Sequence, residues 1–326
     1  MDDGADMSDF PGRPDNEKEW RLIEKLVLSL GVEQRRARRW GIFFKLLTFA
    51  YLFFVVMLLA PSGGHAPSLP KDGFTAVVDV QGVIAADEAA SADNIIAGLR
   101  DAFEADGVKA VVLNINSPGG SPVQSGYVYD EIMRLKELHG IPVYAVIADL
   151  GASGAYYIAA SADYIYADKA SLVGSIGVIG SGFGFVGTME KLGVERRQYT
   201  SGEHKGFLDP FSPVKPEEKV FWESVLNKTH EQFIAQVKHG RGDRLKETPD
   251  MFSGLIWTGE QALELGLIDG LGSVDFVARD VVHAEELVNF TPQDSPFESL
   301  VSRLGASMGK SMASAAGITA SGLQLR

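Results

Sequence analysis

A long apolar run near the N-terminus constrains this chain more than any other feature. Residues 42–60 read IFFKLLTFAYLFFVVMLLA, in which Lys45 is the one charged residue. As an α-helix the run would be about 28 Å long, close to the roughly 30 Å hydrocarbon core of a bilayer. Trp40 stands at its start as an interfacial anchor, and Lys45 is near enough to that end to snorkel. The run predicts a membrane-spanning helix; the alternative, a buried core helix, rarely lacks a polar stripe over this length.

Basic residues gather on the N-terminal side of this run. Arg35, Arg36, Arg38 and Arg39 precede it, whereas Lys71 is the one lysine or arginine in the dozen residues that follow. By the positive-inside rule, the N-terminus stays in the cytoplasm and the rest of the chain is exported. About forty residues precede the run and no small-x-small cleavage site follows it, so we expect an uncleaved signal anchor.

Composition and charge exclude several classes of protein. The 326 residues carry 43 acidic and 30 basic side chains, a net charge of −13, and from position 46 onward the counts are 34 and 21. An exported part this acidic is not expected to bind a nucleic-acid backbone. The chain has no cysteine, which excludes a disulfide scaffold, thiolate metal sites and a cysteine nucleophile.

Neither a metal nor a cofactor is expected. His, Asp and Glu do not occur with metal-ligand spacing in the sequence. Gly182, Gly184 and Gly187 match the dinucleotide fingerprint G-x-G-x-x-G literally. However, they follow a glycine-rich segment instead of a first strand, and they would lie outside the cytosolic nicotinamide pool.

Beyond the apolar run, short apolar strands alternate with helical patterns. Strands are expected at residues 74–80, 108–116, 142–148 and 163–167, with helices between them at 92–105, 123–138 and 152–161. Crossovers of this length imply a mainly parallel sheet inside helical layers, which is an α/β fold. A glycine-rich segment follows residue 170, then a long helix at 216–240 and a second helix whose capping box starts at Thr258.

The segment Ser117-Pro118-Gly119-Gly120 is the first candidate site. It follows a buried strand and precedes a helix, so its backbone N–H groups converge near a helix N-terminus. Such groups can bind an anion or stabilise a developing oxyanion. The alternative is an ordinary strand-to-helix turn, and spacing alone favours that alternative.

The segment LGASGAYY is the second candidate site, with Ser153 between a buried strand and a helix. Its small neighbours would leave the hydroxyl accessible. The alternative is a helix N-cap, which is the usual reason for a serine at this place. An esterase elbow is not supported, because Gly154 follows Ser153 directly and Tyr156 is large, so G-x-S-x-G is not matched.

A serine nucleophile needs a base. A lysine can serve when burial keeps it neutral. Lys205, in SGEHKGFLDPF, fits in part, because glycine and apolar residues follow it, although Glu203 stands two residues before. None of the histidines has a distinctive setting in the sequence; they are His65, His139, His204, His230, His239 and His283.

Four motifs, in their order along the chain, resemble the signal peptide peptidase A family (serine peptidase family S49): AVVLNINSPGG, DLGASGAYYIAASADYIYA, GSIGVIG and SGEHKGFLDPF. The resemblance runs from about Thr75 to Val277 and includes the late segment WTGEQALELGLIDGLGS. The ordered set is specific, whereas any one motif alone is not. It implies a ClpP/crotonase-like α/β fold of repeated β–α units. A chain of this size resembles the short bacterial form, with one N-terminal anchor and an exported peptidase domain.

The resemblance implies a Ser/Lys catalytic dyad. It makes Ser153 the nucleophile and Lys205 the general base, and it matches Ser175 of the GSIG motif to a serine that positions the lysine. The SPGG turn matches the oxyanion hole, with the backbone N–H of Gly120 as the first choice and that of Gly119 as the next.

The activity so implied is that of a membrane-anchored serine endopeptidase. It would degrade remnant signal peptides and other apolar peptides at the outer face of the bacterial cytoplasmic membrane. The implied partners are peptide substrates, the lipid membrane and further copies of the chain in a homo-oligomeric ring, whose neighbouring subunits would share Ser and Lys. We also expect strands at Ile176–Val186 to line the substrate groove.

The predicted organisation has five parts. They are a cytoplasmic N-terminal segment (residues 1–40), a transmembrane signal anchor (41–60), a linker (61–72), a peptidase domain (73–295) and a weakly ordered C-terminal tail (296–326). Two other functions stay open. One is a catalytically inactive membrane scaffold or regulator of other proteases. The other is a crotonase-like acyl-CoA enzyme, which would need a cytosolic domain.

Overall fold

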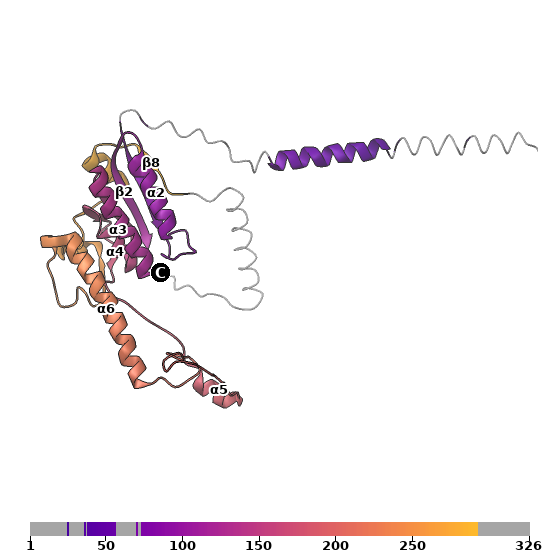
Figure 1. Cartoon of the computed structure of the whole chain (residues 1–326). Coiled ribbons are helices and arrows are strands. Elements are labelled where there is room, and N and C mark those ends of the chain that lie inside the picture. Colours follow the sequence, from indigo (N-terminus) through magenta and orange to yellow (C-terminus); the bar gives the residue numbers. More distant parts are fainter. Residues whose placement is uncertain (1–24, 26–35, 37, 57–69, 71–72, 293–326) are drawn as a thin grey trace, which may run out of the picture. The chain divides into compact units, whose positions relative to one another are not determined.

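The structure, a computed structural model, describes residues 25, 36, 38–56, 70 and 73–292 (Figure 1). Several predicted parts lie wholly or largely outside the described residues. They are the N-terminal segment 1–40, the end of the apolar run at 57–60, the linker 61–72 and the tail 296–326.

The apolar run is helical in the part that is described. The helix Arg38–Val56 has 19 residues, and none of its most apolar stretch is buried. Trp40 stacks on Phe44 at the start of this helix, with ring centroids 5.8 Å apart. By length and composition the helix is sufficient to cross a membrane, as the run predicts.

A mainly parallel sheet is the frame of the part from residue 73 onward (Figure 1). Neighbouring strands lie in the order β6-β5-β3-β2-β1-β8, with β4 beside β3 and β7 beside β4. All pairs are parallel except β5 with β6. The strands are β1 Phe74–Gln81, β2 Val108–Ser117, β3 Val143–Ala152, β4 Tyr164–Ala167, β5 Leu172–Gly174, β6 Ile256–Thr258, β7 Gly270–Leu271 and β8 Leu287–Asn289. The predicted α/β class is confirmed.

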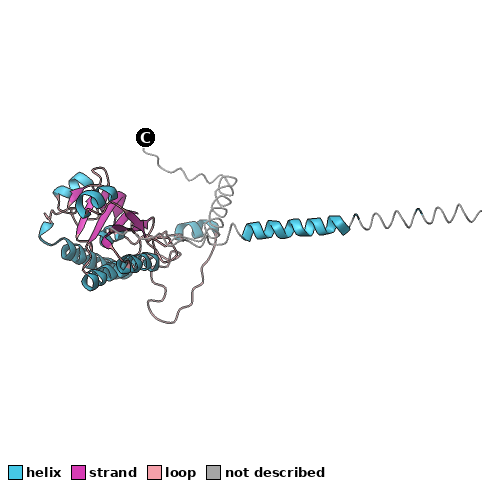
Figure 2. Cartoon of the chain, turned by 90° about the horizontal axis from the view of Figure 1, so that it is seen from above, coloured by secondary structure: helices cyan, strands magenta, loops and turns pink. Residues whose placement is uncertain are grey.

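Helices cover both faces of this sheet (Figure 2). On β2, Leu113 and Ile115 join the larger core, which α2, α3 and α4 cover, whereas Val112 joins a smaller cluster that includes Val277. This alternation buries β2 on both sides, as expected for a parallel strand. The helices are α2 Ala92–Glu104, α3 Pro122–His139, α4 Gly154–Ala159, α5 Val186–Leu192, α6 Pro216–Arg241, α7 Gly259–Glu264, α8 Val274–Phe276, the 3-10 turn Gly242–Arg244 and the π-helix Val277–Val282.

Strand β3 changes its neighbour along its length. Residues Tyr144–Ile147 pair with β4, and residues Leu150–Ala152 pair with β5. The strand is therefore longer than the predicted 142–148, and the helix predicted at 152–161 begins only at Gly154. Ser153 lies at the junction, directly beyond the point where the sheet divides.

The prediction of strands over Ile176–Val186 is wrong. Strand β5 ends at Gly174, and residues 175–185 form neither strand nor helix. Four of these residues are glycines, which have low strand propensity and no side chain to pack on a sheet. We call residues 176–180 the wall, because part of this segment lines a pocket described below.

Only the second half of α6 packs firmly on the core. Phe233, Val237 and Arg241 are buried there, whereas Val220 and Phe221 in the first half are exposed. We call residues 181–227 the arm; it comprises α5, the loop that follows it and the first half of α6, and it projects from the sheet (Figure 1). No residue of α5 is buried within the described chain.

Candidate active site

Ser153 occupies a strained turn between β3 and α4. Its backbone angles are φ 54° and ψ −125°, a conformation that is rare for a residue with a side chain and costs about 1–3 kcal/mol. Its N–H donates to the carbonyl of Gly174 at 2.8 Å, and its carbonyl accepts from the N–H of Tyr157 at 3.0 Å. The side chain makes no capping hydrogen bond, so the hydroxyl is not used as an N-cap.

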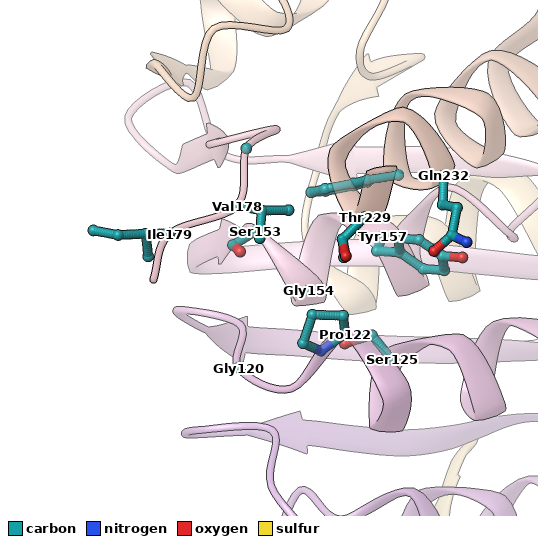
Figure 3. Close-up of a pocket in the computed structure, with 12 residues that line it drawn as sticks. Gly120, Pro122, Ser125, Ser153, Gly154, Tyr157, Val178, Ile179, Thr229 and Gln232 are labelled. Atoms are coloured by element: carbon teal, nitrogen blue, oxygen red, sulfur yellow. The ribbon is translucent and has the colours of Figure 1, made fainter. Parts of the chain in front are cut away.

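Ser153 lines a pocket of about 130 Å³ (Figure 3). Five parts of the chain meet there: the turn after β2, the start of α3, the start of α4, the wall and the second half of α6. The floor is aromatic, since the rings of Tyr157 and Phe233 lie 5.2 Å apart. The lining side chains are Pro122, Ser125, Ser153, Tyr157, Val178, Ile179, Thr229, Gln232 and Phe233, together with Gly120, Gly154 and Gly177.

The SPGG turn lies directly against Ser153. Gly119 has φ 89°, and a Cβ built on it would stand 2.6 Å from the carbonyl oxygen of Ala152 and 2.8 Å from the Cβ of Ser153. Glycine is therefore required at this position both by conformation and by space. A Cβ on Gly120 would collide with the carbonyl of Ile84, to which the turn is bridged.

The two predicted oxyanion donors differ in their hydrogen bonds. The N–H of Gly119 already donates to the Oγ of Ser117 at 3.1 Å. The N–H of Gly120 makes no hydrogen bond to another described residue, and Gly120 lines the pocket. This difference supports Gly120 over Gly119 as a donor to an oxyanion.

Sequence reasoning missed a second candidate donor, Gly154. It is the first residue of α4, so its N–H has no acceptor within the helix. A Cβ on Gly154 would stand 3.2 Å from the nitrogen of Gly120, which places the two glycines side by side at the pocket. The sequence contains a signal for this donor. If a helix starts directly after Ser153, the N–H of Gly154 has no acceptor within the helix.

Ser175 is held close to the Ser153 turn. It follows Gly174, whose carbonyl accepts from Ser153, and its own N–H donates to the carbonyl of Leu255 at 2.8 Å. Its φ of 49° is again unusual for a residue with a side chain. Ser153 and Ser175 are thus brought together through one strand, β5, and the turn beyond it.

Lys205 is not brought to Ser153 within one chain. It is exposed on the arm, and no lysine is among the described residues that line the pocket. Phe207, two residues later, packs on Phe221 of α6 with ring centroids 5.6 Å apart. The pocket is instead lined by Phe233 of α6. At 1.5 Å per residue, Phe233 lies about 18 Å from Phe221 along the helix axis. One copy of the chain therefore presents the serine and the lysine at different places.

The tyrosines near the pocket are neutral at physiological pH. Burial raises the pKa of Tyr129 to about 12, and burial with the nearby charge of Asp130 also raises the pKa of Tyr157. Tyr157 is therefore a neutral hydrogen-bonding group in the pocket and not a base. Within the described part of the chain, no three His, Asp or Glu side chains are grouped as metal ligands would be.

Comparisons with known proteins relate this part of the chain to peptidases. Residues 136–288 match the model of peptidase family S49. A protein of Enterococcus faecium named "Putative signal peptide peptidase SppA" is 38% identical over 55% of this chain and 52% of its own length. Protease 4 of Haemophilus influenzae is 33% identical over 66% of this chain and 35% of its own.

A Brucella melitensis protein named Na(+)/H(+) antiporter NhaA is 47% identical, over 54% of this chain but only 24% of its own length. A solved membrane-bound stomatin-specific protease matches 69% of this chain and 100% of its own with 15% identity, and its TM-score of 0.40 is too low to carry an argument. The chain thus spans about a quarter to a half of the length of the three curated relatives named here. The region that carries Ser153, Ser175 and Lys205 nevertheless matches the model of peptidase family S49 and is similar to proteins named as signal peptide peptidase or protease.

Proposed function

We propose that the chain is a membrane-anchored serine endopeptidase with Ser153 as its nucleophile. The observation that carries the proposal is the turn at Ser153. It holds a hydroxyl free of capping bonds beside the N–H of Gly120, which has no acceptor among the described residues, and both line one pocket. The match of residues 136–288 to peptidase family S49 supports a nucleophilic role for this serine. In this proposal residues 41–60 anchor the protein and residues 73–295 form the peptidase domain.

The proposed reaction is acyl transfer to serine. The side-chain amine of Lys205 takes the proton of Ser153, whose Oγ attacks the carbonyl carbon of the scissile peptide bond. The N–H of Gly120 donates to the oxyanion that forms, with Gly154 beside it and Gly119 as the weaker candidate. Protonated Lys205 then gives its proton to the leaving amine, and water hydrolyses the acyl-enzyme. Ser175 would hold the lysine amine in place.

The lysine would come from a neighbouring copy of the chain. Lys205 lies on an exposed arm whose side chains include Phe183 and Tyr199, exposed by 83% and 91%. Apolar surface of this kind is typical of a surface that another protein covers. A homo-oligomeric ring in which each arm reaches the next subunit would cover it and complete the dyad.

Apolar peptides are the proposed substrates, remnant signal peptides among them. Five of the nine side chains that line the pocket are apolar or aromatic, and the pocket is small enough to select for the residue it admits. The anchor would hold this pocket near the outer face of the cytoplasmic membrane, where cleaved signal peptides remain. The name of the Enterococcus faecium relative agrees with this substrate class.

A fluorophosphonate probe distinguishes this proposal from an inactive scaffold. The full-length protein in detergent should be labelled covalently, and Ser153→Ala should lose the label completely. Ser161→Ala is the matched control, because that buried serine lies just beyond α4 and donates to Ile158. A wild-type protein that is correctly folded and oligomeric but takes no label would favour the scaffold.

A further inference from the structure

The wall has few hydrogen bonds of its own. The N–H of Ser175 pairs with Leu255, and beyond it the backbone leaves the sheet. For residues 176–180, the one hydrogen bond to another described residue joins the carbonyl of Ile176 to a ring nitrogen of His230, at 3.0 Å. Because a carbonyl only accepts, the Nε2 of His230 carries the hydrogen. A single side chain therefore makes the one hydrogen bond between residues 176–180 and the rest of the described chain.

The wall is also the accessible side of the pocket. Ile176 is fully buried and anchors its start, whereas Val178 is half-buried and Ile179 is 87% exposed. Both of the latter line the pocket beside Ser153 (Figure 3). Their N–H and C=O groups make no hydrogen bond within the described residues, so they can pair with an extended peptide.

Packing holds the far end of the wall, and the same helix supplies it. The ring of Trp222 lies against Gly180, where an added Cβ would stand 2.7 Å from the indole nitrogen. Trp222 and His230 both belong to α6, eight residues apart and therefore on similar faces of the helix. Helix α6 thus holds the wall at two points, through one aromatic contact and one hydrogen bond.

We propose that His230 is a positioning residue, which holds the wall in register so that the backbone of a peptide substrate can pair with it beside Ser153. His230 acts through Ile176 and does not touch the reacting atoms. The inference rests on the proposed peptidase function, because it concerns how that site binds an extended chain. A small reagent that reacts with Ser153 needs no such pairing, and this difference makes the role testable.

The test compares His230→Leu, His230→Asn and His230→Gln in the full-length, detergent-solubilised protein. The side-chain nitrogen of glutamine can reach the place of Nε2, whereas the side chain of asparagine is too short.

For a quenched fluorescent peptide of apolar residues, we expect kcat/KM to fall about tenfold in the Leu and Asn variants, mainly through KM. His230→Gln should recover most of this loss. Fluorophosphonate labelling of Ser153 should stay within about twofold in all three. His239→Leu, an exposed histidine on the same helix, is the control and should match the wild type.

A second readout is independent of activity. Amide hydrogen exchange of Ser175, whose N–H donates to the carbonyl of Leu255 directly before the wall, should accelerate in the Leu and Asn variants and not in the Gln variant. Unchanged exchange, or labelling that falls as much as peptide hydrolysis, would overturn the role of His230. A wild-type protein that neither labels nor hydrolyses peptides would instead overturn the proposed function, while the exchange comparison would still decide how the wall is held.

Discussion

At the scale of single residues, the proposed role of Ser153 as nucleophile depends on its unusual backbone conformation. Small neighbours make that backbone conformation accessible: Gly119 on one side and Gly154 on the other come closer than any side chain would allow. The strain at Ser153 is offset by two backbone hydrogen bonds, to Gly174 and from Tyr157. These contacts couple the residues of the turn, so a methyl group added to it should displace the side chain of Ser153.

Gly119→Ala should lower peptide hydrolysis at least about a hundredfold. The new Cβ meets the Cβ of Ser153 and must displace it, and a shift of this size at the reacting atom costs about two orders of magnitude. Rates of peptide hydrolysis and of fluorophosphonate labelling should fall together. Gly126→Ala is the control, since a Cβ there has open space on α3 and should leave activity unchanged. Equal rates for both variants would contradict the described turn.

The sequence is sufficient to single out Ser153, Ser175 and the SPGG glycines, because ordered motifs mark them. It cannot show that Ser117 already occupies the N–H of Gly119, since that depends on the exact path of the turn. Nor does the sequence indicate a role for His230, because its hydrogen-bond partner Ile176 is distant in the chain.

At the scale of secondary-structure elements, α6 connects the arm, the wall and the core. Its C-terminal end is fixed by Arg241, which is 1% exposed and pairs with both carboxylate oxygens of Asp269 at 2.7 and 2.9 Å. Arg244 adds a third contact to Asp269 at 3.2 Å. These bonds join the base of α6 to the loop before β7, so they set the direction in which the arm leaves the core.

Asp269→Asn should destabilise the fold by about 3–5 kcal/mol, because it leaves the buried guanidinium of Arg241 without its counter-charge. Burial raises the pKa of Asp269, but the hydrogen bonds and charge of Arg241 outweigh it and hold the pKa below its ordinary 3.8. The contribution of this ion pair to the free energy of unfolding is therefore fully present above pH 3.8. It is lost as the pH falls through the lowered pKa of Asp269. Urea unfolding of wild type and variant at neutral and acidic pH measures both effects.

Glu247→Gln gives the matched control, because it breaks an exposed pair with Lys238 and should cost less than about 1 kcal/mol. If Asp269→Asn were no more harmful than this control, the pair would not fix the base of α6.

The elements themselves were largely predictable. Helix 216–240 and the capping box at Thr258 follow from local signals, and the structure has both. The wall was predicted as strand and is not, because apolar residues between glycines fit either a strand or an irregular segment. The arm's projection depends on where α6 loses contact with the core, which no local pattern shows.

At the scale of the whole molecule, the proposed site would depend on the membrane and on a second copy of the chain. The helix Arg38–Val56 is apolar enough to span a bilayer, and arginines stand before it in the sequence. The acidic excess after it belongs to the proposed exported domain. The orientation is predicted from the distribution of charge, and the assembly is predicted from the family resemblance. The structure of a single chain shows neither of them.

Reporter fusions at the C-terminus test the orientation. Alkaline phosphatase, which folds only after export, should be active, and a green fluorescent protein exported unfolded should be dark. Replacing the four arginines at 35, 36, 38 and 39 by glutamine should weaken this preference, because the positive-inside rule depends on them. An inactive alkaline phosphatase fusion together with a fluorescent green fluorescent protein fusion would place the domain in the cytoplasm. This result would favour the acyl-CoA enzyme.

The central claim is that Ser153 and Lys205 form one hydrolytic site across two copies of the chain. Its most direct test is the rate of apolar peptide hydrolysis by the full-length protein in detergent, for wild type, Ser153→Ala, Lys205→Ala and the arm control Lys191→Ala. We expect each dyad variant to lose at least about a thousandfold in kcat/KM, and Lys191→Ala to lose nothing. Ser153→Ala and Lys205→Ala, co-expressed with different tags and purified together, should recover part of the activity. Wild-type rates in both single variants would contradict the dyad, and no recovery in the co-purified mixture would contradict its sharing between subunits.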